Sequence, residues 1–107
     1  MTTAAQLVEA VREFLERDVR DKLEGRVQFH TRVAINALAL VERELTMGPE
    51  HAVAHAERLR SLGVESDADL AAAIRDGTFD DRWDEVLDAV RADIAAQLAV
   101  ANPGYAE

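Results

Sequence analysis

One stretch of the sequence, residues 25–45, reads GRVQFHTRVAINALALVEREL and decides the fold. A step of about 100° per residue places its apolar side chains on one side of a helix, expected to run from about Arg26 to Thr46. A side that is roughly 180° wide needs more than one neighbour, so this helix is predicted to be central. The apolar side consists of Val27, Ala34, Ala37, Leu38, Val41 and Leu45, widened by Phe29, Val33 and Leu40.

Four further helices are predicted from apolar residues that recur every three or four positions. The first runs from about Ala4 to Arg17 with Thr3 as its N-cap. The charged stretch Asp18–Glu24 either extends this helix or forms a turn. Gly48–Pro49 is expected to separate the central helix from a third helix, about Pro49–Leu62, because proline suits the first turn of a helix better than its interior.

The two remaining helices lie nearer the C-terminus. A short helix is expected at about Ala68–Asp76, with Gly77 as its stop. A long amphipathic helix is expected at about Arg82–Ala101 and stops before Asn102–Pro103. The expected N-caps are Ser66 or Asp67 for the short helix and Asp80 or Asp81 for the long one.

The architecture that follows is all-α. We expect a helical bundle of about five helices, of which the first, second and fifth are long and the third and fourth form a short hairpin. No run alternates with the period of a β-strand. A chain of 107 residues is expected to form one domain over its whole length, with a short flexible tail from about residue 102.

Composition narrows the classes of partner. The chain carries 21 acidic and 12 basic side chains, a formal net charge of −9. Nucleic acids and anionic membranes bind basic surfaces, so neither is expected as a partner. The absence of cysteine excludes disulfides and cysteine-ligated zinc. No stretch is apolar enough for a membrane span and no signal-peptide pattern precedes the first helix, so we expect a cytoplasmic protein.

The strongest metal-ligand pattern is His51 and His55, whose i, i+4 spacing puts both imidazoles on one side of a helix. Metalloprotease helices place a glutamate after the first histidine, but Ala52 stands there, so the general base is missing. The two histidines are therefore weak candidates, and no metal or other cofactor is expected. No nucleophile motif or phosphate-binding glycine loop is present, so we expect no catalytic activity in the isolated chain.

The candidates for interaction or ligand binding lie on the predicted central helix. Several of its polar groups fall within a strip about 60° wide at the edge of the apolar side, whereas His30 lies inside that side. Guanidinium and amide groups in such a place suit a carboxylate or phosphate of a partner. Alternatively, Arg32 and Arg43 pair with acids of their own chain, and His30 binds a nearby carbonyl. The candidate set is Arg26, Phe29, His30, Arg32, Asn36 and Arg43.

A further pattern extends from the central helix to the end of the chain and consists of Gly25–Arg26, Phe29–His30, Arg32–Val33–Ala34, Asn36–Ala37–Leu38, Val41–Leu45, Gly48–Pro49 and Asn102–Tyr105. These residues resemble a small all-helical bacterial family of unknown function. Members of that family occur beside, or fused to, phosphotransferases of the aminoglycoside/choline kinase type and near acyl-CoA dehydrogenases. The resemblance therefore implies an accessory role and assigns no catalytic residues. Asp21 stands where a proline is expected in the family. The resemblance covers nearly the whole chain.

Three functions remain open from the sequence. The first is a helical accessory or protein-interaction domain with a phosphotransferase-like or acyl-CoA dehydrogenase-like partner. The second is a protein that binds a small acyl or phosphorylated ligand between the second and fifth helices, beside Phe29, His30, Arg32 and Asn36. The third is a metal-dependent enzyme. A homodimer becomes an option if the wide apolar side of the central helix is not fully covered.

Overall fold

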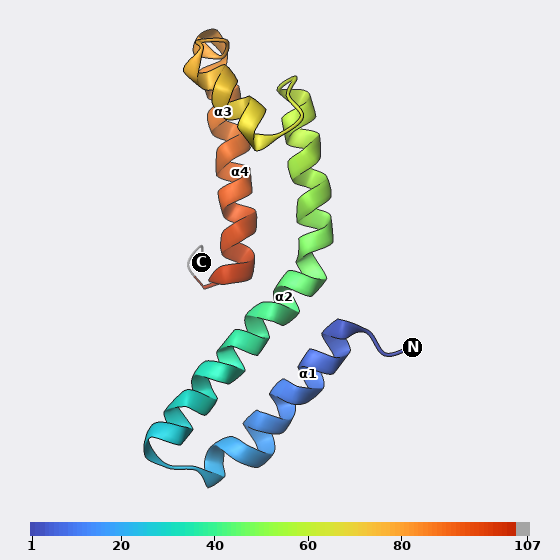
Figure 1. The fold of residues 1–107 in the computed structure, drawn as a ribbon, viewed down its shortest axis with the longest axis vertical. Helices are drawn as coiled ribbons and strands as arrows, with labels where there is room; N and C mark the ends of the chain where they lie inside the picture. The colour runs from blue at the N-terminus through green and yellow to red at the C-terminus, as the bar shows by residue number, and fades with distance from the viewer. Residues whose placement is uncertain (105–107) are drawn as a thin grey trace. The chain divides into compact units, whose positions relative to one another are not determined.

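The computed structural model describes residues 1–104, and within them the chain forms four α-helices and no β-strand, which confirms the predicted all-α class (Figure 1). None of the helices in this part of the chain is long and apolar enough to cross a membrane. The backbone divides into two compact units, residues 1–48 and 49–107. The helices are α1 (Ala4–Phe14), α2 (Gly25–Ser61), α3 (Asp67–Arg75) and α4 (Trp83–Ala101).

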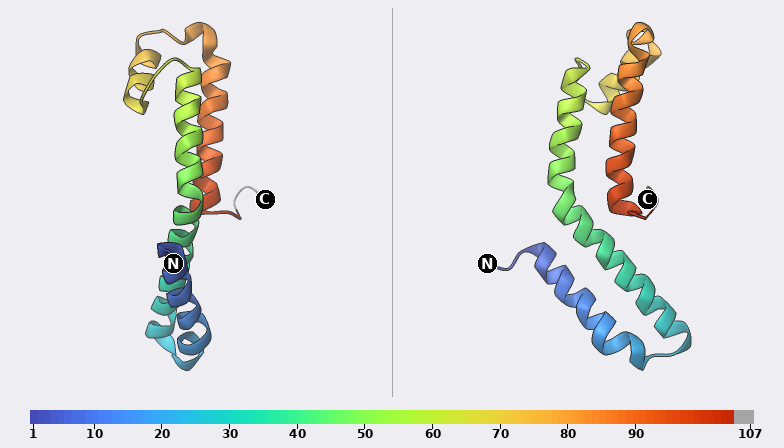
Figure 2. Two further views of the ribbon diagram at one scale, coloured as in Figure 1. Left: turned by 90° about the vertical axis from the view of Figure 1, so that its right-hand side faces the viewer. Right: turned by 180° about the vertical axis from the view of Figure 1, so that it is seen from behind.

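The first unit is a helical hairpin made of α1 and the first part of α2, which lie side by side and antiparallel (Figures 1 and 2). α1 is capped by Thr3, the predicted N-cap, whose hydroxyl accepts from the Gln6 N–H at 3.1 Å. The Gln6 side chain accepts in turn from the Thr3 N–H at 2.9 Å, so two donors at the helix start are satisfied.

The charged stretch after α1 extends the helix and then turns. A π-helical segment (Leu15–Val19) and a 3₁₀ turn (Arg20–Lys22) follow α1 directly. The Gln28 amide braces this turn by donating to the Arg20 carbonyl at 3.2 Å. Gly25 then starts α2 with a φ of +63°, a conformation that favours glycine.

α2 continues without interruption through Gly48 and Pro49, so the predicted break at that point is wrong. The expected second and third helices are therefore one helix, five helices become four, and the short third helix of the expected hairpin is not a separate element. Pro49 removes the backbone hydrogen bond to Leu45, but its fixed φ fits a helix. Ending and restarting the helix would require a second costly nucleus. Gly48–Pro49 instead coincides with the boundary between the two compact units.

Glycine ends α2 and α3 as the sequence predicts. After α2, Gly63 takes a φ of +82° and donates to the Arg60 carbonyl at 2.9 Å, while Val64 donates to the Leu59 carbonyl at 3.1 Å. These two bonds form a Schellman motif, which satisfies carbonyls at the helix end. The same pair of bonds follows α3 around Gly77.

The N-caps of α3 and α4 differ in how well they were predicted. Ser66 caps α3, since its hydroxyl accepts from the Asp69 N–H at 3.1 Å. Neither Asp80 nor Asp81 caps α4, because these residues lie in a 3₁₀ turn that leads directly into the helix. The N-cap of α4 is Arg82, which makes no capping bond with its side chain.

The second unit contains the part of α2 after Gly48, together with α3 and α4, and it has a compact core. Leu62, Phe79 and Val86 are buried together, and Phe79 and Val86 are the largest fully buried side chains. Half-buried side chains of α3, including Leu70 and Ile74, pack against this cluster. α4 ends at Ala101, near the predicted stop, and the rest of the predicted tail, residues 105–107, lies outside the described residues.

Two glycine substitutions test the correction to α2. In Gly48→Ala the added Cβ meets only the flexible end of the Glu44 side chain, so the better helix former should raise the free energy of unfolding by about 0.5–1 kcal/mol. In Gly63→Ala the positive φ should lower it by roughly 1–2 kcal/mol. Urea unfolding followed by circular dichroism measures both. A loss in Gly48→Ala as large as that in Gly63→Ala would contradict a continuous helix.

Candidate interaction surface

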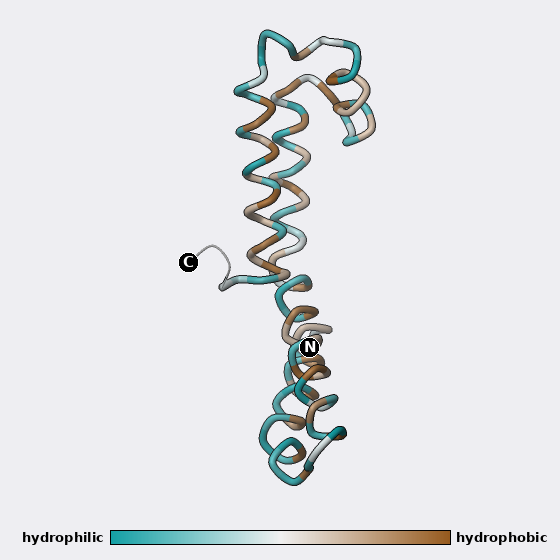
Figure 3. The backbone as a smooth tube through the Cα atoms, turned by 90° about the vertical axis from the view of Figure 1, so that its left-hand side faces the viewer, coloured by the Kyte–Doolittle hydropathy of each residue, from teal (hydrophilic) through white to brown (hydrophobic). Residues whose placement is uncertain are grey.

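The apolar side chains of the hairpin are mostly exposed. Within residues 1–48, Ile35 is the one large hydrophobic side chain that is buried, at 5% exposure. Nine Leu, Val and Phe side chains of the same segment are between 39% and 62% exposed. Figure 3 shows the apolar positions that recur along both helices of the hairpin. Ile35 is not a member of the wide apolar side predicted for residues 25–45, and within that side only Leu38 is half-buried. The contact with α1 therefore leaves most of the predicted side exposed.

Six of these exposed side chains lie on one side of the hairpin. The Arg12–Glu42 contact marks where the two helices meet. At about 100° of rotation per residue, the exposed residues of α1 lie roughly 100–160° from Arg12 around the helix axis. Those of α2 lie roughly 60–100° from Glu42, in the same sense of rotation relative to the chain direction. Because antiparallel helices wind in opposite senses when seen from one end, both rotations lead to the same side. This apolar face consists of Leu7, Val11, Phe14, Val27, Val41 and Leu45.

The apolar face is large for a small protein. If such a side chain exposes about 150–200 Å² when fully open, the six expose on the order of 500 Å². Complete burial of one Val, Leu or Phe side chain stabilises a protein by roughly 1.5–3 kcal/mol. Covering the exposed parts of these six side chains would therefore contribute about 5 kcal/mol or more. That is comparable with the whole stability of a marginal small domain. The face is therefore expected to be covered by another surface.

The predicted candidate residues surround a second apolar strip on the outer side of α2. Phe29, Val33 and Leu40 are exposed there, at roughly 100° or more from most of the apolar face. We call these three residues the outer strip. Arg32 and Asn36 lie along one edge of it by helical rotation, and both are exposed.

The other candidates lie close to this strip. Arg26 and His30 are exposed, and the rings of His30 and Phe29 meet edge to face at 5.6 Å. Arg43 is half-buried and has a partner in the structure. All six candidates come from one helix, and five of them are exposed. Two surface hollows of the structure lie on other segments, one lined by residues 80–85 and one by part of α2 from Pro49 to Glu57.

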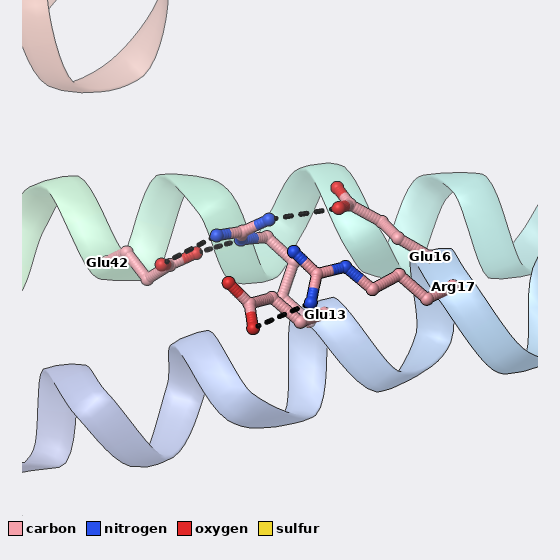
Figure 4. Close-up of polar contacts among 5 residues, drawn as sticks. Glu13, Glu16, Arg17 and Glu42 are labelled. Atoms are coloured by element: carbon pink, nitrogen blue, oxygen red, sulfur yellow. Dashed lines mark hydrogen bonds and ion pairs between the residues drawn. The ribbon is translucent and has the colours of Figure 1, made fainter.

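An ion pair that the sequence analysis did not predict joins the two helices of the hairpin. The Arg12 guanidinium binds both carboxylate oxygens of Glu42, one through Nε and the other through Nη2 at 3.2 Å. Arg12 also donates to Glu16 at 3.1 Å, and the hydrogen bond to Glu42 is the main cause that raises the pKa of Arg12. Figure 4 shows Glu13, Glu16, Arg17 and Glu42 around this contact.

A second polar cluster joins the helices of the other unit. His55 on α2 contacts Asp93 on α4 through Nδ1 and Asp67 on α3 through Nε2, each at 2.9 Å. Arg58 donates to the same Asp93 through Nε at 2.8 Å. The hydrogen bond to Asp93 is the main cause that raises the pKa of His55, with burial opposing it. Burial also opposes the shift of Asp93, but hydrogen bonds from Arg58 and His55 lower its pKa.

This cluster places one of the two predicted metal candidates among carboxylates. Both ring nitrogens of His55 contact carboxylates, an arrangement that suits an imidazolium donor. In the described part of the chain no group of three or more His, Asp or Glu side chains is arranged to hold a metal ion. His51 remains one turn away on α2 and is half-buried.

Sequence reasoning missed these two clusters for a clear reason. Arg12 and Glu42 are 30 residues apart, and Arg58 and Asp93 are 35 apart. Each side chain looks like an ordinary charged residue on the polar side of its own helix. The i, i+4 spacing of Arg12 and Glu16 is the only local signal, and it indicates a pair within one helix.

The hairpin ion pair predicts a difference between two similar substitutions. Glu42→Gln removes a half-buried charge from Arg12, and we expect the free energy of unfolding to fall by about 1–2 kcal/mol. Glu13→Gln is the matched control, because its partner Arg17 is 73% exposed and the change should stay within about 0.5 kcal/mol. Urea unfolding at low salt measures both. Equal effects would show that the Arg12–Glu42 pair adds no stability.

The His55 cluster predicts a pH dependence. A raised pKa in the folded state means that the charged imidazole stabilises the fold fully below the pKa of an unfolded histidine, about 6.5. This contribution is lost as the pH rises through the higher pKa of the folded state. The free energy of unfolding should therefore fall as the pH rises above about 6.5.

The control for this measurement is on the same helix. His55→Gln should remove most of the decline, whereas His51→Gln should keep it. Asp93 does not contribute to the decline, because its lowered pKa keeps the carboxylate ionised over this pH range. A decline that persists unchanged in His55→Gln would disprove the role of the His55 cluster.

Comparison with known proteins gives one match. Residues 21–105 match the model of a family described as Domain of unknown function (DUF6285). No curated protein and no solved structure matches the chain. The match covers most of the chain, including all of α2, whereas α1 lies before it. This chain therefore belongs to the DUF6285 family, an all-helical domain of unknown function.

Proposed function

We propose that this chain is an accessory domain that binds a partner protein through the outer strip of α2 and the polar groups along its edges. The observation that carries the proposal is the exposure of Phe29, Val33 and Leu40 next to Arg32 and Asn36. Aromatic and arginine side chains are enriched at the centres of protein interfaces, where they supply much of the binding energy. The strip faces away from α1, so the fold of the hairpin leaves it free to bind.

The partner class comes from the resemblance noted in the sequence. A phosphotransferase-like enzyme of the aminoglycoside/choline kinase type is the first candidate, and an acyl-CoA dehydrogenase-like enzyme is the second. A carboxylate on either enzyme would suit the guanidinium of Arg32 and the amide of Asn36. The proposed setting is the cytoplasm of a bacterium.

A protein partner fits the geometry better than a small ligand does. Small-ligand sites are concave and bury most of the ligand. Phe29, His30, Arg32 and Asn36 are all exposed and project from a single helix. Such a convex surface suits insertion into a groove of a larger protein. The helix then supplies anchors at i, i+4, i+7 and i+11, which are Phe29, Val33, Asn36 and Leu40.

The proposal predicts binding to one of the two enzyme classes. The chain is mixed with a purified phosphotransferase-like or acyl-CoA dehydrogenase-like enzyme from the same genome, and binding is measured by calorimetry. In the double variant Phe29→Ser, Arg32→Glu, we expect the affinity to fall about a hundredfold or more, because an aromatic anchor is lost and a positive charge is replaced by a negative one.

The matched control is Val53→Ser, an equally exposed apolar residue of α2 in the other unit, which should bind like the wild type. Binding that is indifferent to Phe29 and Arg32 would move the interface elsewhere. No binding to either enzyme class would refute the proposed partner.

A further inference from the structure

The charges of the chain are divided unevenly between its two compact units. Residues 1–48 carry seven basic and eight acidic side chains, a formal net charge of −1. Residues 49–107 carry five basic and thirteen acidic side chains, a net charge of −8. Two copies that meet through the first unit would therefore meet with little like-charge repulsion. The apolar face lies in this nearly neutral unit.

The apolar face itself is free of charge at its centre. Between its members on α2, the same side of the helix carries Ala34 and Leu38. Charged side chains are depleted in the cores of interfaces between identical subunits, which are about two-thirds apolar. The face has this character, whereas a surface that receives an unrelated acidic or basic partner would be expected to carry complementary charges.

We propose that the apolar face binds the same face of a second copy of this chain, so that two hairpins form a four-helix bundle. The inference is independent of the proposed function, which uses the outer strip on another side of α2. In an isologous pair one self-complementary patch serves both copies, and the contact closes on itself. Each helix of the hairpin then has two neighbours, as the wide apolar side of residues 25–45 requires.

The area of the face agrees with such a pair. Stable interfaces bury roughly 800 Å² on each partner, and the six apolar side chains supply on the order of 500 Å² of it. Half-buried and polar atoms around them would make up the remainder. The outer strips stay exposed on both copies, so a dimer would present two sites for the partner protein.

The mass of the chain in solution is the first test. Light scattering at about 50–100 µM should give twice the 11.8 kDa of one chain. The double variant Val11→Glu, Leu45→Glu should give the mass of a monomer, because it places four carboxylates in the apolar contact of the pair. Val33→Glu, on the outer strip of the same helix, should remain a dimer. A wild type that stays monomeric, or a double variant that stays dimeric, overturns the inference.

Single cysteines give a second test that does not depend on a destabilising variant. The chain has no cysteine, so one cysteine placed at Val11, Phe14, Val41 or Leu45 is the only thiol present. A residue near the two-fold axis meets its own copy, so at least one of these four variants should form an intermolecular disulfide on mild oxidation. Val33→Cys should form none. No cross-link at any of the four positions, or an equal yield at Val33, refutes the pairing.

The two proposals fail separately. A monomeric wild type that still binds one of the enzymes through Phe29 and Arg32 keeps the proposed function and removes the dimer. A dimer that binds neither enzyme class keeps the dimer and removes the proposed function. If the Val11→Glu, Leu45→Glu variant stays monomeric but loses its helical circular dichroism, the cysteine cross-links decide the question.

Discussion

A hairpin of two helices can bury only the sides on which the helices touch. α1 and the first part of α2 meet through one strip each, with Ile35 buried and the Arg12–Glu42 pair at the contact. The apolar side of residues 25–45 is much wider than one such strip, so most of it has no neighbour within the hairpin. Both the outer strip and the apolar face follow from this geometric limit. The functional interpretation of the chain depends on it.

The second unit buries part of its apolar side chains by adding a further helix. Leu62, Phe79 and Val86 form a closed core because α3 and the turn after it add a third layer to the α2–α4 contact. Its charged groups are also ordered by tertiary contacts, since His55 and Arg58 share Asp93 across two helices. The unit carries most of the negative charge of the chain and a compact core.

The helix ends were largely predictable, because their signals are local. A cap needs a hydroxyl three residues before a free N–H, as at Thr3 and Ser66, and a C-terminal glycine needs only its own positive φ, as at Gly63. Pro49 was predicted wrongly, because a proline inside a helix and a proline at a helix start have similar local sequences. The balance between the cost of an interior proline and the cost of a second nucleus decides between them. The candidate residues of α2 were predicted to share an edge, but their exposure was not predictable.

The sequence alone determined that the chain is helical, that Thr3 and Ser66 cap helices and that Gly63 and Gly77 end them, and that residues 25–45 have a wide apolar side. These properties depend on the spacing of residues within one helix, which the order of amino acids defines. Only the tertiary structure decided which part of that side is buried, and which charged residues meet across 30 or more positions. Those contacts depend on the rotation of each helix about its axis, and that rotation is set by the packing of helices distant in sequence.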